Sequence, residues 1–200
     1  LPAELGQLTK LTALGITGND IQSLPAEMKN LSGMKNLIWE STTDSKKDIS
    51  ASFEVLSQMT GLETLHLILS KAVHLPPEIG TLQNIKELVL ECSSLQSLPD
   101  EFGDIANLEK LELRSCNILT DVNALTQLSK LSMLQMETSK KVKPYPRPMD
   151  MKTRGEVEDY FRRLLKASGK KLPDILEKKA SGGDRATAAK LKKFLKQRDY

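Results

Sequence analysis

The 200-residue sequence has only two cysteines, Cys92 and Cys116, a single tryptophan and no long apolar run. Two cysteines cannot build the framework of several disulfides that stabilises many small secreted domains. Without a run of about 18 consecutive apolar residues, no membrane-spanning helix is expected. The sequence therefore favours a reducing compartment, and we expect a cytoplasmic protein whose two thiols stay free.

Sequence motifs that mark common catalytic sites are also missing. The chain contains no G-x-x-x-x-G-K-[ST], no G-x-S-x-G, no H-E-x-x-H and no C-x-x-C. Its two histidines, His66 and His74, have no second histidine or cysteine at the spacing of metal ligands. We therefore expect neither a cofactor nor a metal site, and no small-molecule substrate.

Charge is distributed unevenly along the chain. Residues 1–139 contain 10 Lys/Arg against 18 Asp/Glu, whereas residues 140–200 contain 19 against 8. Such asymmetry predicts an interaction tail on an acidic body. Nucleic acid, an anionic membrane surface and an acidic protein are the candidate ligands of such a tail.

A repeated apolar pattern fills most of the sequence. Residues 75–97 and 98–120 align without a gap, both begin Leu-Pro, and Leu95 of the first falls on Ile118 of the second. The leucine-like residues that begin each L-x-x-L-x-L core lie 23, 28, 23, 23 and 23 residues apart: Leu11, Met34, Leu62, Ile85, Leu108 and Leu131. A period of this length predicts a stacked solenoid. Because the chain opens at Leu1 within the pattern, we expect it to derive from a longer protein.

Each repeat should contribute a short strand, a turn and a short helical return, since no repeat can bury its apolar face alone. Residues three and five after each anchor should point into the core: Leu14/Ile16, Leu37/Trp39, Leu65/Leu67, Leu88/Leu90, Leu111/Leu113 and Leu134/Met136. The residue eight after each anchor should be small and bond to neighbouring backbone: Asn19, Thr42, Ser70, Ser93, Cys116 and Ser139. Five residues are inserted once, and the polar stretch Ser41–Ser52 predicts a loop that protrudes at the edge of the sheet.

The repeats fade after Met136. Residues 140–148 are basic and punctuated by proline, which predicts an extended segment. The spacing of Thr153 and Glu156 is that of a capping box, and an apolar helical face follows, made of Val157, Tyr160, Phe161, Leu164 and Leu165. We expect this helix to seal the open end of the core, with a short helix from Pro173 and a basic helix after Asp184 beyond it. The predicted domains are residues 1–139, an array of about six repeats, and residues 140–200, a basic helical cap and tail.

The form L-P-x-E-(I/L/F)-G-x-L-x-x-L-x-x-L-x-L at 23-residue spacing resembles the intracellular leucine-rich repeats of Ras-interacting scaffold proteins, their plant relatives and many bacterial proteins. The likeness covers residues 1–138. The segment 155–161 is similar to one that often follows the last repeat in that group. The resemblance implies an α/β solenoid with a curved parallel sheet on the concave face and short helices on the convex face. It also implies protein–protein recognition, of the kind found in signalling scaffolds.

In such a fold, the residues two, four and six after each anchor face out from the concave surface. On the middle strands this places Ile38, Ile68 and Val89 in solvent with acidic residues around them. Exposed apolar side chains ringed by charge are typical of an interface, although a solvated face with β-branched strand formers is the alternative. The predicted partner-binding residues are Ile38, Glu40, His66, Ile68, Glu87, Val89, Glu91, Glu112, Arg114 and Glu137.

The leading hypothesis is therefore a scaffold that binds a basic or amphipathic protein segment on this acidic face. The alternative is that residues 140–200 bind nucleic acid or an anionic membrane while the repeats position them. An enzyme is not expected. Acidic pairs such as Glu87 and Glu91 would lie on an open surface, without the enclosed pocket that tunes one carboxyl as acid and another as base.

Overall fold

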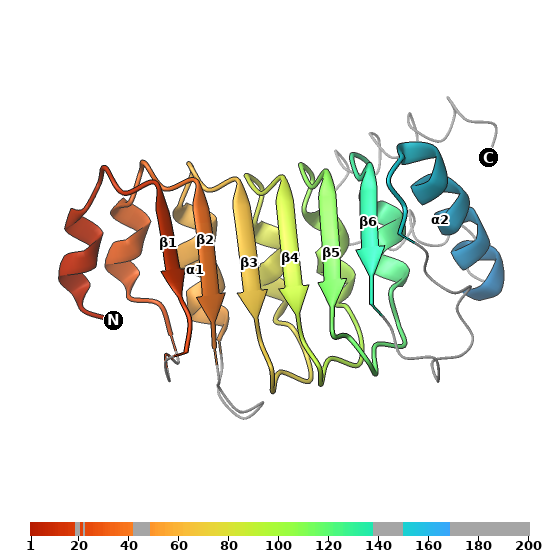
Figure 1. The fold of residues 1–200 in the computed structure, drawn as a ribbon, viewed down its shortest axis with the longest axis horizontal. Helices are drawn as coiled ribbons and strands as arrows, with labels where there is room; N and C mark the ends of the chain where they lie inside the picture. Colours follow the sequence, from red (N-terminus) through yellow and green to blue (C-terminus); the bar gives the residue numbers. More distant parts are fainter. Residues whose placement is uncertain (19–20, 22, 42–48, 138–149, 169–200) are drawn as a thin grey trace, which may run out of the picture.

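Six short parallel strands form one open sheet, in the order of the sequence, in the computed structural model of the protein (Figure 1). The structure describes residues 1–18, 21, 23–41, 49–137 and 150–168. The strands are β1 (Ala13–Ile16), β2 (Asn36–Glu40), β3 (Thr64–Ile68), β4 (Glu87–Glu91), β5 (Lys110–Arg114) and β6 (Met133–Met136). The predicted α/β solenoid with a parallel sheet is confirmed.

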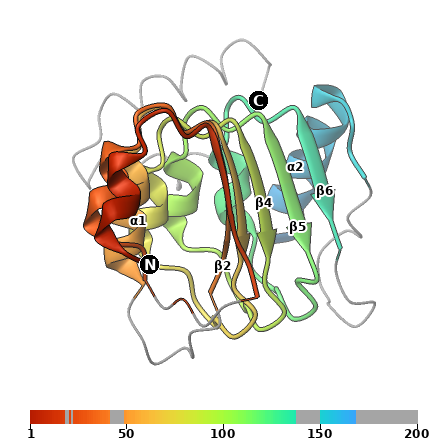
Figure 2. The same ribbon diagram turned by 60° about the vertical axis from the view of Figure 1, so that its left-hand side comes forward.

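Short helices form a second layer on one side of the sheet (Figure 2). They are η1 (Ala3–Gln7), η2 (Ala26–Asn30), α1 (Ser50–Gln58), η3 (Pro77–Thr81), η4 (Asp100–Asp104) and η5 (Asn123–Gln127). Proline precedes four of the 3-10 helices, where its fixed φ and missing N–H suit the first position outside a helix. Successive helices pack so closely that a Cβ at Gly80 would lie 2.5 Å from the Glu101 carbonyl oxygen, which explains the glycine of the repeat.

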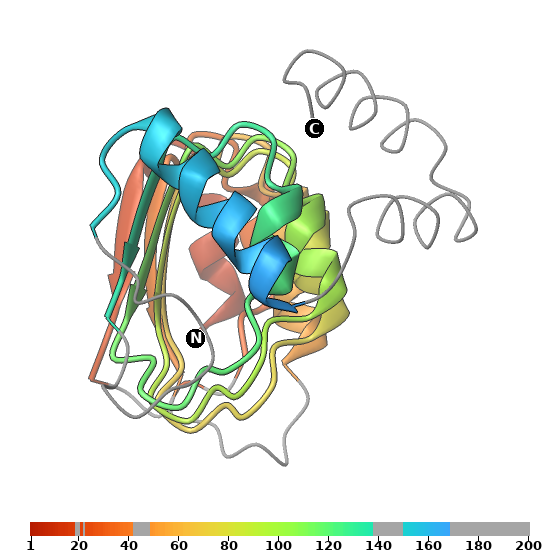
Figure 3. The same cartoon turned by 90° about the vertical axis from the view of Figure 1, so that its right-hand side faces the viewer.

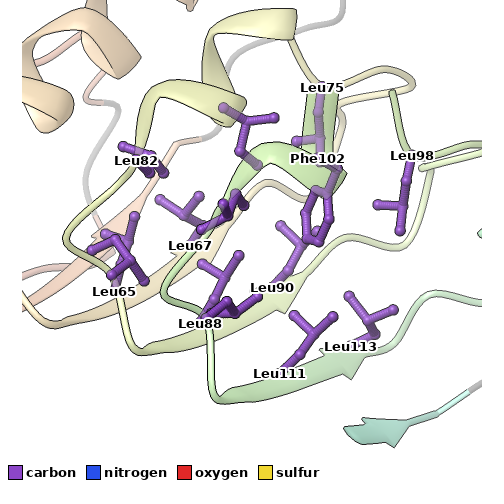
Figure 4. Packing of buried hydrophobic residues seen from close by; sticks show 14 of the residues in the cluster. Leu65, Leu67, Leu75, Leu82, Leu88, Leu90, Leu98, Phe102, Leu111 and Leu113 are labelled. Carbon is purple, nitrogen blue, oxygen red and sulfur yellow. The ribbon is translucent and has the colours of Figure 1, made fainter. Parts of the chain in front are cut away.

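The core lies between the two layers, where the strands pair in register. Leu65, Leu88 and Leu111 lie side by side on β3, β4 and β5, and all of their side chains are buried. Figure 4 shows these leucines, with Leu67, Leu90 and Leu113, directed toward Phe102 and the leucines of the helical layer. The predicted inward positions are confirmed, Trp39 among them. Leu14 alone is only half-buried, because it lies on the first strand of the array.

The inserted stretch is not a protruding loop at its ends. Ser41, Ile49 and Ser52 are buried, and Ser50–Ser52 form the first turn of α1. The Ser52 hydroxyl oxygen accepts a 3.1 Å hydrogen bond from the backbone N–H of Leu24. A serine that satisfies buried backbone is polar without being exposed, so the polarity of this stretch was misleading. Residues 42–48 lie outside the described residues.

The predicted equivalence of Leu95 and Ile118 is wrong. Leu95 is buried, but Ile118 is 45% exposed and its neighbour Leu119, 1% exposed, occupies the core position. The reason is one additional residue after β5, Ser115, which adopts a φ of 54°. The shift ends before η5, because Pro99 separates Leu98 from η4 whereas Val122 directly precedes η5.

The same one-residue shift separates the two cysteines. Cys92 lies seven residues after its anchor and Cys116 eight, yet both are buried free thiols. In the repeat of Cys92 the residue eight after the anchor, Ser93, is therefore exposed. Its hydroxyl still donates a 3.0 Å hydrogen bond to the Ser70 carbonyl, as predicted for that position. Asn19, Thr42 and Ser139 lie outside the described residues.

Helix α2 (Arg154–Ser168) lies across the end of both layers (Figure 3). The predicted capping box is confirmed: the Glu156 carboxylate accepts from the Thr153 N–H at 2.9 Å, and the Thr153 hydroxyl oxygen accepts from the Glu156 N–H at 3.4 Å. Val157, Tyr160 and Leu164 are buried, and α2 packs against η5 and β6. The boundary at residues 139 and 140 stays a prediction, and residues 140–148 and both helices predicted after Pro173 lie outside the described residues.

Candidate partner-binding surface

The side chains of the strands that point away from the helices form what we call the open sheet face. Figure 1 looks onto this face, and no described element lies in front of it. The in-register pairing arranges the outward side chains in three rows that cross the strands. The first row is Asn36, Thr64, Glu87, Lys110 and Met133; the central row is Ile38, His66, Val89, Glu112 and Gln135; the third row is Glu40, Ile68, Glu91 and Arg114.

All ten predicted partner-binding residues occupy this region. Nine lie in the three rows, and Glu137 immediately follows β6. The uncharged centre is formed by Ile38, His66, Val89 and Ile68 on three neighbouring strands. Ile38 is 40% exposed and the other three are partly exposed, so these side chains are accessible to a ligand.

His66 lies at the middle of that centre, between Ile38 and Val89. Burial lowers the pKa of its imidazole, and the charge of Arg114 lowers it further, against the opposing effects of Glu91 and Glu112. The imidazole is therefore neutral at neutral pH. Its Nε2 atom is covered and has no hydrogen-bond partner among the described residues. The central row is thus uncharged across β2, β3 and β4.

Glu112 differs from the other predicted acidic contacts because the residue is buried, at 7% exposed. Its carboxylate lies 2.9 Å from the Lys110 Nζ and 2.6 Å from a terminal nitrogen of Arg114. Burial acts to raise the pKa of this carboxyl, but the hydrogen bonds from the two cations outweigh it and the pKa is lowered. Glu112 therefore orients Lys110 and Arg114 rather than presenting a free negative charge.

Two other carboxylates stabilise turns. The Glu40 carboxylate accepts a 2.6 Å hydrogen bond from the N–H of Gly18, and that of Glu137 accepts a 3.4 Å bond from the N–H of Ser115. Gly18 and Ser115 are the residues with positive φ in the described part of the chain, at 68° and 54°. In the three repeats between them, the equivalent N–H bonds instead to a backbone carbonyl of the next repeat, as Cys92 does to Arg114 at 3.3 Å. A glutamate side chain in the following repeat thus replaces a backbone acceptor where the residue seven after the anchor has a positive φ.

These carboxylate–backbone contacts were not predicted from the sequence, although Gly18 is a residue type that favours a positive φ. The remaining carboxylates are the most available for a ligand. Glu87 lies 3.8 Å from the Lys110 Nζ, a long contact, and the ion pairs among the described residues do not include Glu91. The face therefore combines an uncharged centre with carboxylates on both sides.

The described residues contain no group of three or more His, Cys, Asp or Glu side chains that could hold a metal ion. No helix in the same part of the chain is long and apolar enough to cross a membrane.

Of the basic segment 140–200, the structure describes residues 150–168. There, Arg154 pairs with Glu158 at 2.9 Å and Arg162 with Asp159 at 2.6 Å.

Comparison with known proteins agrees with this architecture. Residues 60–118 match a family model described as leucine rich repeat. The leucine-rich repeat protein LIC12759 of Leptospira interrogans is 26% identical with a TM-score of 0.52, covering 68% of this chain and 34% of that one. The structure of a TLR13–ssRNA13 complex is 27% identical with a TM-score of 0.54, covering 71% of this chain and 21% of that one. No curated protein matches the sequence.

The chain has the fold of a leucine-rich repeat solenoid, and the family model itself matches residues 60–118. It spans about a third of the Leptospira protein and about a fifth of TLR13. Leucine-rich repeat arrays generally serve as binding modules rather than as enzymes, and this chain has the fold of such a module. The intracellular type of its repeats stays a prediction.

Proposed function

We propose that this protein is an interaction scaffold that binds a segment of another protein on the open sheet face. One observation supports this most directly: Ile38, Ile68 and Val89 come from three different strands, yet they form one accessible apolar group. Clustered apolar side chains with a charged surround are typical of protein interfaces. The rigid sheet holds them in place before the partner arrives, which lowers the entropy cost of binding.

The charges on this face favour a basic partner. Glu87 and Glu91 flank Val89 along β4, and Glu40 follows Ile38 on β2. A cluster of one sign speeds the approach of an oppositely charged partner and disfavours partners of the same sign. Binding to a macromolecule, and not catalysis, is the function that this open arrangement supports. We place it in the cytoplasm, where both buried thiols would stay reduced.

Affinity capture with matched variants tests the proposal. The double variant Ile38→Lys/Glu91→Lys changes the face, and Ile118→Lys/Glu54→Lys makes the same substitutions elsewhere. The two isoleucines are comparably exposed, at 40% and 45%, and Glu54 lies exposed on α1. We expect the face variant to lose a partner that wild type and control both retain, with all three proteins folded by circular dichroism. Equal recovery of every captured protein by both variants would contradict the proposal.

A further inference from the structure

The rows of the open sheet face restrict the shape of the partner. Along β4, Val89 is bounded by Glu87 and Glu91. A ligand running parallel to the strand therefore meets a carboxylate on either side of one apolar side chain. Across the strands, Ile38, His66 and Val89 follow one another without a charge, because the pairing places them side by side. The continuous uncharged path on this face therefore crosses the strands.

The spacing of that path matches an α-helix. Neighbouring strands lie about 4.8 Å apart, so Ile38 and Val89 are separated by about 9.6 Å. Successive turns of a helix are about 5.4 Å apart, and residues i and i+7 are separated by about 10.5 Å. A helix lying across β2, β3 and β4 therefore places one turn over each strand. An extended chain advances about 6.6 Å between side chains on the same side, which does not match this spacing.

The carboxylates provide the flanks of this path. Glu40 and Glu91 lie in the third row, also two strands apart, with Ile68 between them. Glu87 lies in the first row, on the opposite side of Val89. Basic residues two turns apart on one flank of a helix would thus lie opposite Glu91, which is outside the ion pairs of the described residues, and Glu40, whose Oε2 also accepts the Gly18 N–H. Beyond the path, Lys110 and Arg114 are held on β5 by Glu112 and limit its length.

We propose that the partner segment is an amphipathic α-helix lying across β2, β3 and β4. Its apolar stripe, at i, i+4 and i+7, covers Ile38, His66 and Val89, and its basic flanks face Glu40, Glu91 and Glu87. The ligand is therefore recognised as a helix whose apolar stripe covers the uncharged path and whose basic flanks meet carboxylates. This inference rests on the proposed function and specifies the partner's conformation and charge pattern.

Selection from two peptide display libraries tests the inference. Both contain peptides of about 18 residues with the same overall composition of Leu, Lys, Ala, Gln and Glu. One library restricts the apolar residues to a helical stripe and the other to strict alternation, with charged positions randomised in both. The 200-residue chain is the target, and counter-selection uses Val89→Glu. Glu54→Lys is the control variant, because it lies on α1, away from the face.

We expect enrichment only in the helical library, with lysine favoured on the flanks. Binding of the enriched peptides should fall at least tenfold on Val89→Glu, remain unchanged on Glu54→Lys, and be lost when a central residue becomes proline. Enrichment of alternating peptides, of acidic flanks or of no pattern would overturn the helix. If alternating peptides won and still required Val89, the proposed function would stand and the helical partner alone would fail. If peptide binding ignored Val89, both would fail.

Discussion

The two cysteines are the residues whose chemistry the fold constrains most. Burial raises the pKa of the Cys92 thiol to about 11 and, with the neighbouring charge of Cys92, that of the Cys116 thiol to about 12. The Cys92 thiol also donates to the carbonyl oxygen of Leu69 at 3.0 Å. Because the thiolate is the reactive form, these side chains are packing residues of the core.

A labelling experiment follows from this environment. Neither thiol of the native protein should react measurably with a water-soluble thiol reagent at pH 8 or so, whereas both should react within the mixing time in denaturant. Any slow labelling of the native protein should occur at the rate at which the repeats open and expose the thiols. Two thiols that label rapidly without denaturant would contradict the burial of Cys92 and Cys116.

The lowered pKa of His66 predicts that the stability of the protein depends on pH. Its pKa is lowered in the folded protein from the ordinary value of 6.5, so the unfolded chain takes up a proton first as the pH falls. The stability that His66 contributes is complete above about pH 6.5 and is lost as the pH falls through the folded pKa. Denaturant unfolding at pH 7.5 and at about 5.5 should show a larger loss for wild type than for His66→Gln. Equal losses would show that His66 is solvated in the folded protein.

For some residues the sequence was sufficient to predict whether the side chain is buried. The inward leucines and Trp39 followed from the two-residue period of a strand, which depends only on local geometry. The burial of Glu112 and Ser52 did not, because each is stabilised by partners that pattern reasoning does not identify. Those partners are Lys110 and Arg114 for the carboxylate, and the Leu24 N–H for the hydroxyl.

At the scale of elements, the turn after β5 is the clearest departure from the repeat. Ser115 widens it by one residue, and Glu137 of the following segment accepts the Ser115 N–H. A gap-free alignment cannot detect this, because the additional residue is balanced by one residue fewer before η5, where nothing corresponds to Pro99. The first turn of α1 was missed for a different reason, since the polar stretch that contains Ser50 and Ser52 was assigned to a loop. The capping box of α2, a local motif, was predicted correctly.

The turn after β5 yields a matched pair of substitutions. Leu119→Ala should lower the free energy of unfolding by about 2–5 kcal/mol, because it deletes a buried side chain. Ile118→Ala, one residue earlier and 45% exposed, should change it by at most about 0.5 kcal/mol. Urea unfolding followed by the fluorescence of Trp39 measures both. The reverse order of effects would restore the alignment of Leu95 with Ile118.

At the scale of the whole molecule, one core and one accessible face share the same six strands. The period of 23 residues predicted the stack, since each repeat must bury its apolar side against the next. It also predicted which side chains would lie on the open sheet face. It could not predict that the carboxylates on this face have different partners. Glu112 is held by cations, Glu40 stabilises a turn, and Glu91 is outside the ion pairs of the described residues. These differences depend on contacts between repeats.

Binding on the open sheet face is tested most directly by cross-linking from defined positions of the chain. A photo-reactive amino acid would replace Val89 on the open sheet face or Glu54 on α1, in the presence of the captured partner. We predict a covalent adduct from position 89 and none from position 54, with the cross-linked partner residue on the apolar side of a helix. An adduct from position 54 alone would contradict binding on the open sheet face.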